Sequence, residues 1–348
     1  MKIVTIVGAR PQFIKYACIY NDLRKEHDEI LVHTGQHYDY EMSKIFFDEL
    51  DIPAPEYNLE VGSYTHGKQT ALMLERIEKV LLKEKADIVL VYGDTNSTLA
   101  GALAAVKLSM LVAHIEAGLR SYRLDMPEEV NRVLTDRISK FLFCPTKTAV
   151  KNLKNEGMVK GVYLVGDVMY DAFLDSQKLL SKRKILSKLE LKPKGYLLLT
   201  IHRQENTDNF KNLKSILSAL IKAEEKIVFP SHPRTKKALK KIEGFKLKNF
   251  LPIKPVSYLD MLVLEKNARK ILTDSGGVQK EAYWLGTPCI TLRNETEWVE
   301  TVEDKWNILT GAKSDKIINA IKNFNPSEKQ RKIFGNGKAS LKIARLMR

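Results

Sequence analysis

Short apolar runs alternate with longer amphipathic stretches along nearly the whole chain, and this alternation limits the fold more than any other feature. Regular succession of this kind is typical of a parallel sheet covered by helices. In the first half we expect strands near 2–7, 29–34, 87–92, 111–116, 141–144 and 162–165. In the second half we expect strands near 196–201, 226–230, 248–252, 270–273 and 288–292.

The amphipathic stretches between these runs predict the helices. In the first half they should lie near 11–26, 39–50, 66–84, 96–108, 127–138 and 146–156. In the second half they should lie near 207–223, 234–243, 257–266, 277–285, 296–304 and 314–323. Each half is therefore predicted to be a doubly wound, Rossmann-like α/β domain.

A chain of 348 residues is too long for one ordinary core and indicates two domains. The junction falls in the lysine-rich segment 166–194, so we expect an N-terminal domain over 1–167 and a C-terminal domain over 168–325. Two such domains facing each other would bring the carboxyl ends of both sets of strands into one cleft. Open α/β sheets bind their ligands at such ends.

Composition narrows the class of protein. Hydrophobic residues make up 44% of the chain and charged residues 28%, which is typical of a globular protein. No apolar run reaches membrane-spanning length, and the chain begins with a buried strand, which predicts neither a membrane span nor a signal segment. The three cysteines, Cys18, Cys144 and Cys289, are scattered and lack metal-binding spacing, which favours a reducing cytoplasm.

A net charge of +15 raises the hypothesis of nucleic-acid binding. However, the lysines gather in stretches such as 181–184 and 236–241, which contain no aromatic residues for base stacking. A solvated basic surface is therefore favoured over a nucleic-acid groove. Such a surface would still attract an anionic substrate.

The segment Ile271-Leu-Thr-Asp-Ser-Gly-Gly-Val-Gln-Lys-Glu281 predicts a strand that turns directly into a helix. Free N–H groups and the helix dipole at such a turn favour a phosphate, and Gly276 and Gly277 permit its close approach. Ser275 can add a hydroxyl, and Glu281, one turn further along, can reach the sugar of a nucleotide. The segment lacks the spacing of the dinucleotide and Walker motifs, so a tight turn without a ligand remains the alternative.

Charged side chains follow the predicted strands of the first half. Arg10 and Lys15 lie at the start of the first helix, where we expect ligand contact rather than a solvent-facing pair of cations. Asp94 and Glu116 end two successive strands, and two carboxylates that share a site can serve as acid and base. Asp94 has an alternative role as a helix N-cap.

Three further residues belong to this hypothesis. Of the pair Glu128 and Glu129, one should face the cleft and the other should be a solvated residue of the first helical turn. His114 is expected to be a core histidine rather than a catalytic one. His202 ends a strand opposite the carboxylates and is a candidate catalytic group, whereas His232, flanked by prolines, should shape a loop that contacts the ligand.

Seven motifs in order resemble those of the non-hydrolysing UDP-N-acetylglucosamine 2-epimerases. They are Gly8-Ala-Arg-Pro-Gln-Phe-Ile-Lys15, Thr34-Gly-Gln-His37, Gly93-Asp-Thr95, His114-Ile-Glu-Ala-Gly-Leu-Arg120, Pro127-Glu-Glu-Val-Asn-Arg132, His202-Arg-Gln-Glu-Asn206 and Asp274-Ser-Gly-Gly-Val-Gln-Lys-Glu281. The resemblance implies the two-domain glycosyltransferase-B architecture, a final helix over about 326–347 that returns to the first domain, and a homodimer. It also implies that the second domain holds UDP.

The resemblance implies a reaction that the residues can support. Elimination of UDP across C1–C2 leaves a 2-acetamidoglucal, and re-addition with protonation on the opposite face inverts C2. That route needs a cationic cradle for the diphosphate and acid–base groups on both sides of the sugar, but no metal or cofactor. By family correspondence the catalytic group is Asp94, Glu116, Glu128 and His202. The phosphates would contact Arg10, Lys15, Ser275, Gly276 and Gly277, and the ribose would contact Glu281.

One departure from the family leaves the substrate open. Many bacterial members have Thr-Glu-Arg-Pro-Glu where this chain has Thr296-Glu-Trp-Val-Glu300. Trp298 and Gln12 are similar to those of relatives that epimerise UDP-2,3-diacetamido-2,3-dideoxyglucuronate, which is the alternative substrate. A UDP-sugar glycosyltransferase and a non-catalytic nucleotide-sugar binder are alternative classes. A glycosyltransferase would not need the carboxylates of the first domain.

Overall fold

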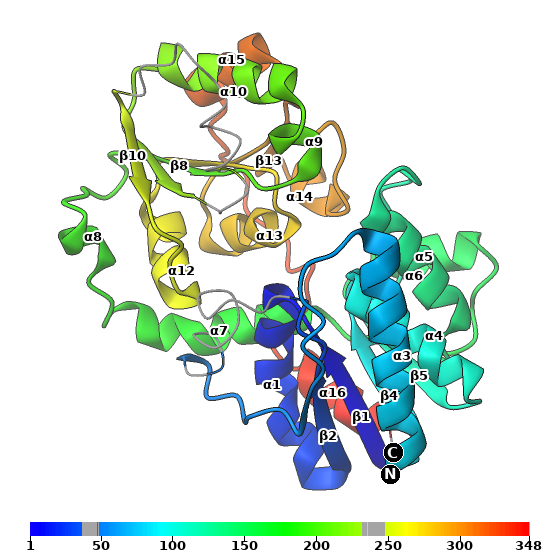
Figure 1. The fold of residues 1–348 in the computed structure, drawn as a ribbon. Coiled ribbons are helices and arrows are strands. Elements are labelled where there is room, and N and C mark those ends of the chain that lie inside the picture. Colours follow the sequence, from blue (N-terminus) through cyan, green and yellow to red (C-terminus); the bar gives the residue numbers. More distant parts are fainter. Residues whose placement is uncertain (37–46, 48, 232–234, 236–247, 348) are drawn as a thin grey trace. The chain divides into compact units, whose positions relative to one another are not determined.

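The computed structural model describes residues 1–36, 47, 49–231, 235 and 248–347 of the chain. Contacts divide the chain into two compact units, with Met1–Asp175 and Lys332–Arg348 in unit 1 and Ser176–Arg331 in unit 2 (Figure 1). Helix α7 (Val168–Leu180) begins in unit 1 and ends in unit 2. A boundary at 167/168 would fall at the start of this helix.

In the described part of unit 1, seven parallel strands form a sheet in the order β3-β2-β1-β4-β5-β6-β7. The strands are β1 (Lys2–Val7), β2 (Asp28–His33), β3 (Tyr57–Asn58), β4 (Ile88–Tyr92), β5 (Leu111–Ile115), β6 (Phe141–Cys144) and β7 (Val162–Leu164). The helices are α1 (Arg10–Glu26), α3 (His66–Glu84), α4 (Asn96–Lys107), α5 (Pro127–Ile138), α6 (Lys147–Asn155), the start of α7, and α16 (Ala339–Leu346).

The register of this sheet brings three turns to one edge. Thr5 pairs with Leu90, and Tyr92 pairs with Ile115, so β1, β4 and β5 end at nearly the same level. Because the chain passes from β1 to β2 on one side and later to β4 on the other, the ligand-binding crevice of a doubly wound sheet is expected beside β1 and β4. The motif residues that follow these three strands therefore lie together at the edge where such sheets bind ligands.

Within the residues described for unit 2, six parallel strands form a sheet in the order β10-β9-β8-β11-β12-β13. The strands are β8 (Leu197–Thr200), β9 (Ile227–Pro230), β10 (Phe250–Ile253), β11 (Lys270–Thr273), β12 (Cys289–Thr291) and β13 (Asn307–Leu309). The helices are α8 (Ile185–Lys188), α9 (Gln204–Thr207), α10 (Phe210–Lys222), α12 (Tyr258–Asn267), α13 (Gly276–Leu285), α14 (Val299–Glu303) and α15 (Ser314–Asn323).

Each sheet is buried on both faces, as its unbroken apolar strands predict. All residues of β4 and β8 are buried. In unit 2 one face of the sheet packs with Leu213 and Leu217 of α10 and Ile317 of α15, and the other packs with Leu264 of α12 and Ala282 of α13. The prediction of two parallel α/β sheets is confirmed.

Several element predictions need correction. The short edge strands β3 and β13 and helix α7 were not expected, because their patterns are brief or follow a charged junction. The single helix expected over 207–223 is two helices, since Asn209 caps α10 by accepting hydrogen bonds from the N–H groups of Lys211 (3.1 Å) and Asn212 (3.2 Å). The helices expected over 39–50 and 234–243 lie largely outside the described residues.

The end of the chain returns to unit 1 as expected, but most of it is not helical. Only α16 forms, because Gly335 and Gly337 adopt φ of +97° and +75°, which interrupts a helix over 326–347. The segment is nevertheless fixed: the N–H of Asp167 donates to the carbonyl of Phe334 at 2.9 Å. The Asp171 carboxylate accepts from the N–H of Ser340 at 2.8 Å.

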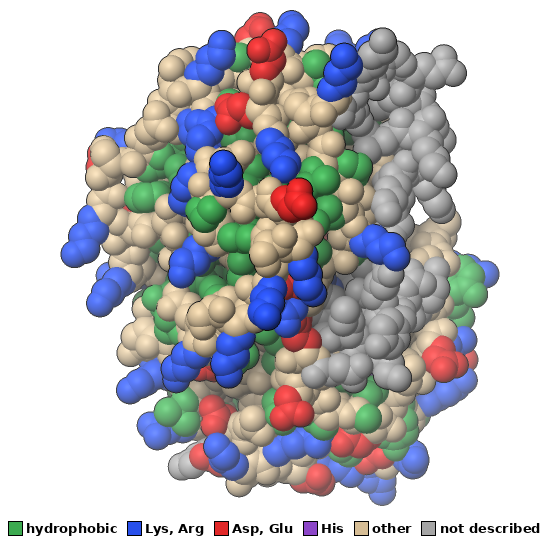
Figure 2. All heavy atoms as spheres, turned by 90° about the vertical axis from the view of Figure 1, so that its left-hand side faces the viewer, with side chains coloured by type: hydrophobic (Ala, Val, Ile, Leu, Met, Phe, Trp, Pro, Cys, Tyr) green, Lys and Arg blue, Asp and Glu red, His purple; other side chains and the backbone are tan. Residues whose placement is uncertain are grey.

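Basic side chains are exposed on unit 2. Lys182, Lys184, Lys188 and Lys192, in the segment around α8, all face solvent. Figure 2 shows Lys and Arg side chains spread over one face of the molecule, with fewer acidic ones between them. None of the helices in the described ranges combines the length and the apolar character that a membrane crossing requires.

Candidate active site

The turn from β1 to α1 is built around the buried side chain of Gln12. Its Oε1 accepts from the N–H groups of Gly8 (2.8 Å) and Ala9 (3.0 Å), and its Nε2 donates to the Tyr92 carbonyl (2.9 Å) and the Thr98 hydroxyl (3.1 Å). All four bonding positions of the amide are therefore used within the protein. Gln12 joins the ends of β1 and β4 and has no amide group left for a sugar, so any link between Gln12 and the substrate stays a prediction from resemblance.

Lys15 lies where the three turns of unit 1 meet. Its ammonium forms an ion pair with the Glu116 carboxylate, and the Lys15 side chain is 5% exposed. Nζ also lies 3.1 Å from the position that a Cβ on Gly93 would occupy. Glu116 adopts φ of +73°, a left-handed conformation that is uncommon for a non-glycine residue. The structure thus brings Lys15 and Glu116 together beside the turn that carries Asp94, with Arg10 at the first position of α1.

Asp94 is held by helix α5. Its carboxylate forms an ion pair with Arg132, and its carbonyl accepts from Asn131 Nδ2 at 3.0 Å. The N-cap of α4 is Thr95, whose hydroxyl accepts from the N–H of Thr98, so Asp94 is not the helix cap. With its side chain 30% exposed, Asp94 remains accessible to a ligand.

The two glutamates at the start of α5 have different roles. Glu129 is 1% exposed and accepts from Ser121 N–H (2.9 Å), Ser121 Oγ (2.9 Å), Tyr122 N–H (2.8 Å) and Arg132 Nη1 (2.8 Å). The expectation that the second glutamate is a solvated first-turn residue is therefore wrong, because Glu129 anchors the 121–122 loop. Glu128 is half-buried and remains the candidate for the site.

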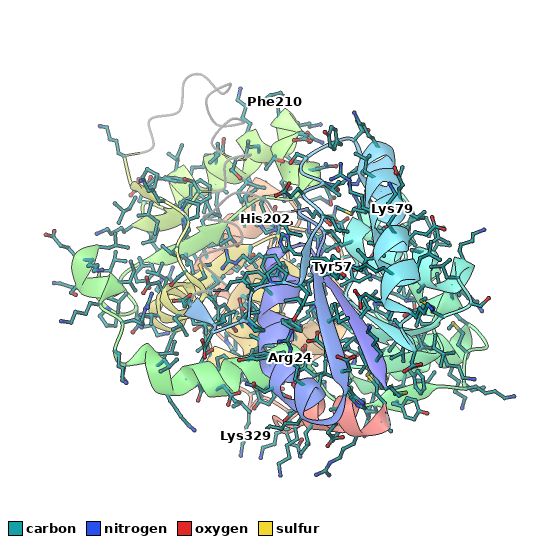
Figure 3. The ribbon with its side chains drawn as sticks, turned by 60° about the horizontal axis from the view of Figure 1, so that its bottom comes forward. Arg24, Tyr57, Lys79, His202, Phe210 and Lys329 are labelled. Atoms are coloured by element: carbon teal, nitrogen blue, oxygen red, sulfur yellow. The ribbon has the colours of Figure 1, made fainter. Side chains whose placement is uncertain are left out.

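In unit 2, His202 lies two residues after the end of β8 and is labelled in Figure 3. Its side chain is 42% exposed, and its Nδ1 lies 3.7 Å from Oδ1 of Asp274, within ion-pair range but beyond a hydrogen bond. Asp274 is fully buried and accepts from the N–H groups of His202 (3.1 Å) and Arg203 (3.1 Å) and from Asn206 Nδ2 (3.0 Å). Asp274 thus fixes the backbone that presents the histidine.

The predicted phosphate turn begins helix α13. Ser275 is the N-cap, and its side chain makes no capping bond within the described residues, so the first N–H groups of the helix are available to an anion. Trp298 lies against this turn: its Nε1 is 3.2 Å from the position of a Cβ on Gly276. The adjacent Glu297 is neutralised by Arg293, whose Nη1 and Nη2 each donate to it at 3.0 Å.

The remaining predicted residues are placed as follows. Gly277 occupies the first turn of α13, and Glu281, one turn later, is 5% exposed. Lys280 on the same helix is also buried, with its ammonium 4.0 Å from the centre of the Trp298 ring. His232 lies outside the described residues.

Sequence reasoning assigned no role to four residues that hold the site together, namely Asn131, Arg132, Asp136 and Asp274. One signal was present for the α5 members, because Arg132 and Asp136 follow Glu128 at spacings of four and eight and so share its helix face. For Asp274, an acidic residue directly after a buried strand was the only sign. Neither pattern shows which residues these side chains bind, because those residues lie in turns that follow other strands.

The fold and the two sets of turns define a two-unit α/β protein with a helix start that has no side-chain cap and with carboxylates near the strand ends of unit 1. The family model described as UDP-N-acetylglucosamine 2-epimerase matches residues 21–348. The chain belongs to this family. A Methanococcus maripaludis protein named UDP-N-acetylglucosamine 2-epimerase homolog is 60% identical, and the match covers 100% of this chain and 99% of that protein.

Two further relatives bear on the substrate. A Pseudomonas aeruginosa UDP-2,3-diacetamido-2,3-dideoxy-D-glucuronate 2-epimerase is 48% identical, over 99% of this chain and 98% of that protein. The crystal structure of Methanocaldococcus jannaschii UDP-GlcNAc 2-epimerase in complex with UDP-GlcNAc and UDP superposes with a TM-score of 0.95 at 48% identity, covering 100% of this chain and 99% of that one. Relatives with different named substrates are therefore equally similar in sequence.

Proposed function

We propose that the chain catalyses the reversible C2 epimerisation of UDP-N-acetylglucosamine to UDP-N-acetylmannosamine. The observation that carries this proposal is the arrangement of Asp94 and Glu116, which follow neighbouring strands and are paired with Arg132 and with Lys15, respectively. A sugar transferase has no need of two carboxylates at this position, whereas proton transfer at C2 requires acid–base groups there.

The chemistry proceeds by elimination and re-addition. A base removes the C2 proton, the electron pair forms the C1–C2 double bond, and the C1–oxygen bond breaks as UDP departs. A proton then adds to C2 of the 2-acetamidoglucal from the opposite face, and a UDP oxygen forms the C1 bond again. The acid–base groups are Asp94, Glu116, Glu128 and His202. Arg132 holds the carboxylate of Asp94 in place and Lys15 that of Glu116, and the proposed reaction uses no metal or cofactor.

The diphosphate needs a cradle that stabilises its charge while it is detached. The N–H groups at the start of α13, with Ser275, Gly276 and Gly277, supply one part, and Arg10 and Lys15 supply cations. Glu281 is assigned to the ribose and His232 to a loop that contacts the ligand. The proposal requires that one substrate molecule reach both sets of residues.

Exchange of the C2 hydrogen tests the proposal. In D₂O, UDP-N-acetylglucosamine should acquire deuterium at C2 and yield UDP-N-acetylmannosamine, followed by NMR, with free UDP and the glycal as side products. Absence of exchange with both this sugar and UDP-2,3-diacetamido-2,3-dideoxyglucuronate contradicts the epimerase assignment.

Trp298 supports UDP-2,3-diacetamido-2,3-dideoxyglucuronate as the alternative substrate. Trp298 replaces an arginine of many bacterial members and lies against the phosphate turn, and the Pseudomonas aeruginosa relative is named for the diacetamido-uronate. If that sugar exchanges and UDP-N-acetylglucosamine does not, the reaction is retained and the substrate changes.

The proposal extends to assembly and location. Leu82 on α3 and Leu134 on α5 are 57% and 47% exposed, and a homodimer can cover such apolar positions. Light scattering on the purified protein measures this directly. Cys18, Cys144 and Cys289 are free thiols, which fits a reducing cytoplasm.

A further inference from the structure

A fully buried histidine lies behind the carboxylates of unit 1. His114 on β5 is 0% exposed, with Nδ1 2.7 Å from Oδ1 of Asp136 and Nε2 2.7 Å from the carbonyl oxygen of Gly93. Both ring nitrogens are therefore within hydrogen-bond distance of an oxygen atom, one on helix α5 and the other in the turn after β4.

The carboxylate of Asp136 on α5 is the centre of this cluster. Burial opposes its ionisation, but the hydrogen bond from His114 and the charges of His114 and Arg120 prevail and lower the pKa of Asp136 below its ordinary value. Its Oδ2 also accepts from the N–H of Gly118 (3.1 Å) and from Arg120 Nη1 (2.7 Å). Arg120, which is buried, in turn pairs with the partly exposed Glu156 at 2.6 Å.

The two bonds of this pair end on the two turns that carry the candidate carboxylates. Gly93 directly precedes Asp94 and adopts φ of +65°. Gly118 follows Glu116 by two residues, and these two adopt φ of +80° and +73°. For the two glycines this conformation costs little, whereas for Glu116 it persists only where the surroundings fix it. Here one buried carboxylate is bonded to both turns, directly or through His114.

We propose that His114 and Asp136 are positioning residues, which together set the separation of Asp94 and Glu116 at the sheet edge. This inference rests on the proposed function, since it assigns the pair a task in proton transfer at C2. The pair contacts no substrate. It acts by holding the Gly93 carbonyl and the Gly118 N–H at fixed positions, so that two carboxylates from different strands meet the same carbon atom.

Two amide substitutions separate this role from simple core packing. In His114→Gln the amide nitrogen reaches the place of Nε2 and keeps the bond to Gly93, while Asp136 keeps its own bonds to Gly118 and Arg120. In His114→Asn the nitrogen reaches the place of Nδ1 and keeps only the bond to Asp136. Both variants replace the ring by a smaller amide side chain, so they share the cost of losing a packed aromatic ring.

The experiment measures kcat and KM for C2 exchange of the sugar that the wild-type protein processes, with thermal unfolding and UDP binding as controls. We expect His114→Asn to lose at least about tenfold in kcat with little change in KM, and His114→Gln to stay within about threefold of wild type. Equal losses of kcat in both variants, or an undiminished kcat in His114→Asn, overturn the proposal.

A crystal structure of His114→Asn gives a readout that does not depend on activity. The Gly93 carbonyl and the Asp94 side chain should move relative to Glu116, whereas in His114→Gln they should stay in place. An unmoved Asp94 in His114→Asn overturns the positioning role. If the wild-type protein exchanges neither sugar, the proposed function fails, while the position of Asp94 still decides whether the pair sets the geometry.

Discussion

Substitution of Glu129 by glutamine should destabilise unit 1, whereas the same change at Glu128 should affect turnover. Glu129 accepts four hydrogen bonds while 1% exposed, and three of them converge on Oε2. A glutamine can place its oxygen at only one of the two positions. With the oxygen on the three-donor side, the amide NH₂ faces the Tyr122 N–H, which donates to Oε1 at 2.8 Å in the native protein.

The magnitude follows from these contacts. In Glu129→Gln the charge-assisted bond from the Tyr122 N–H is replaced by two N–H donors that face each other, and Arg132 then faces a neutral amide instead of a carboxylate. Together these changes should lower the free energy of unfolding by about 3 kcal/mol. For a unit of this size that corresponds to a fall in Tm of about 6–12 °C. Glu128→Gln is the matched control and should leave Tm within about 2 °C while it lowers kcat for C2 exchange.

Thermal unfolding followed by circular dichroism, with C2 exchange measured on the same preparations, provides the assay. A Tm of Glu129→Gln within about 2 °C of wild type would refute the reasoning, because the four bonds to Glu129 would then contribute nothing. A fall in Tm for Glu128→Gln as large as that for Glu129→Gln would show that the two glutamates were assigned to the wrong roles.

Three further predictions concern unit 2. His202→Ala should abolish C2 exchange and leave the UDP affinity measured by calorimetry largely intact; lost affinity with an unchanged rate at saturation would make His202 a binding residue. Gly276→Ala should weaken UDP binding by about tenfold, because the new Cβ lies 3.2 Å from Nε1 of buried Trp298 and narrows the approach to the helix N–H groups. Gly67→Ala, with open space around the added Cβ, is the control and should bind UDP normally. Burial lowers the pKa of Lys270 from 10.5 to about 8, so between these values the folded protein binds fewer protons than the unfolded chain. Denaturant titrations should therefore show the unfolding free energy of wild type rising with pH over that window relative to Lys270→Met, and a parallel pH dependence of the two would contradict the shift.

The regular alternation of apolar and amphipathic segments is sufficient to predict both sheets and most of the helices. Helices α3, α5 and α15 begin and end where their periodicity predicts, because each carries an apolar stripe between clear boundaries. Strands β3 and β13 span two and three residues, too short for any periodic signal. The helix over 326–347, which the resemblance implied, is wrong for a different reason: Gly335 and Gly337 adopt positive φ and interrupt it.

The site was only partly predictable, because its geometry depends on contacts between strand ends. The sequence placed Asp94 and Glu116 after successive strands, which parallel pairing brings to one edge. It could not show that α5 supplies Arg132 and Asp136 to those turns, nor that all the bonding positions of the Gln12 amide are used within the protein. Such assignments require partners that are distant in the chain, and no local pattern encodes them.

The central claim is that the bond between C1 and the diphosphate oxygen breaks and forms again during epimerisation. UDP-N-acetylglucosamine labelled with ¹⁸O in the bridge between C1 and the β-phosphorus tests it directly, with ³¹P NMR to locate the label. We predict that the label moves from the bridging to the non-bridging positions of the β-phosphate as C2 exchanges its hydrogen. Exchange at C2 while the label remains entirely in the bridge would contradict elimination and re-addition.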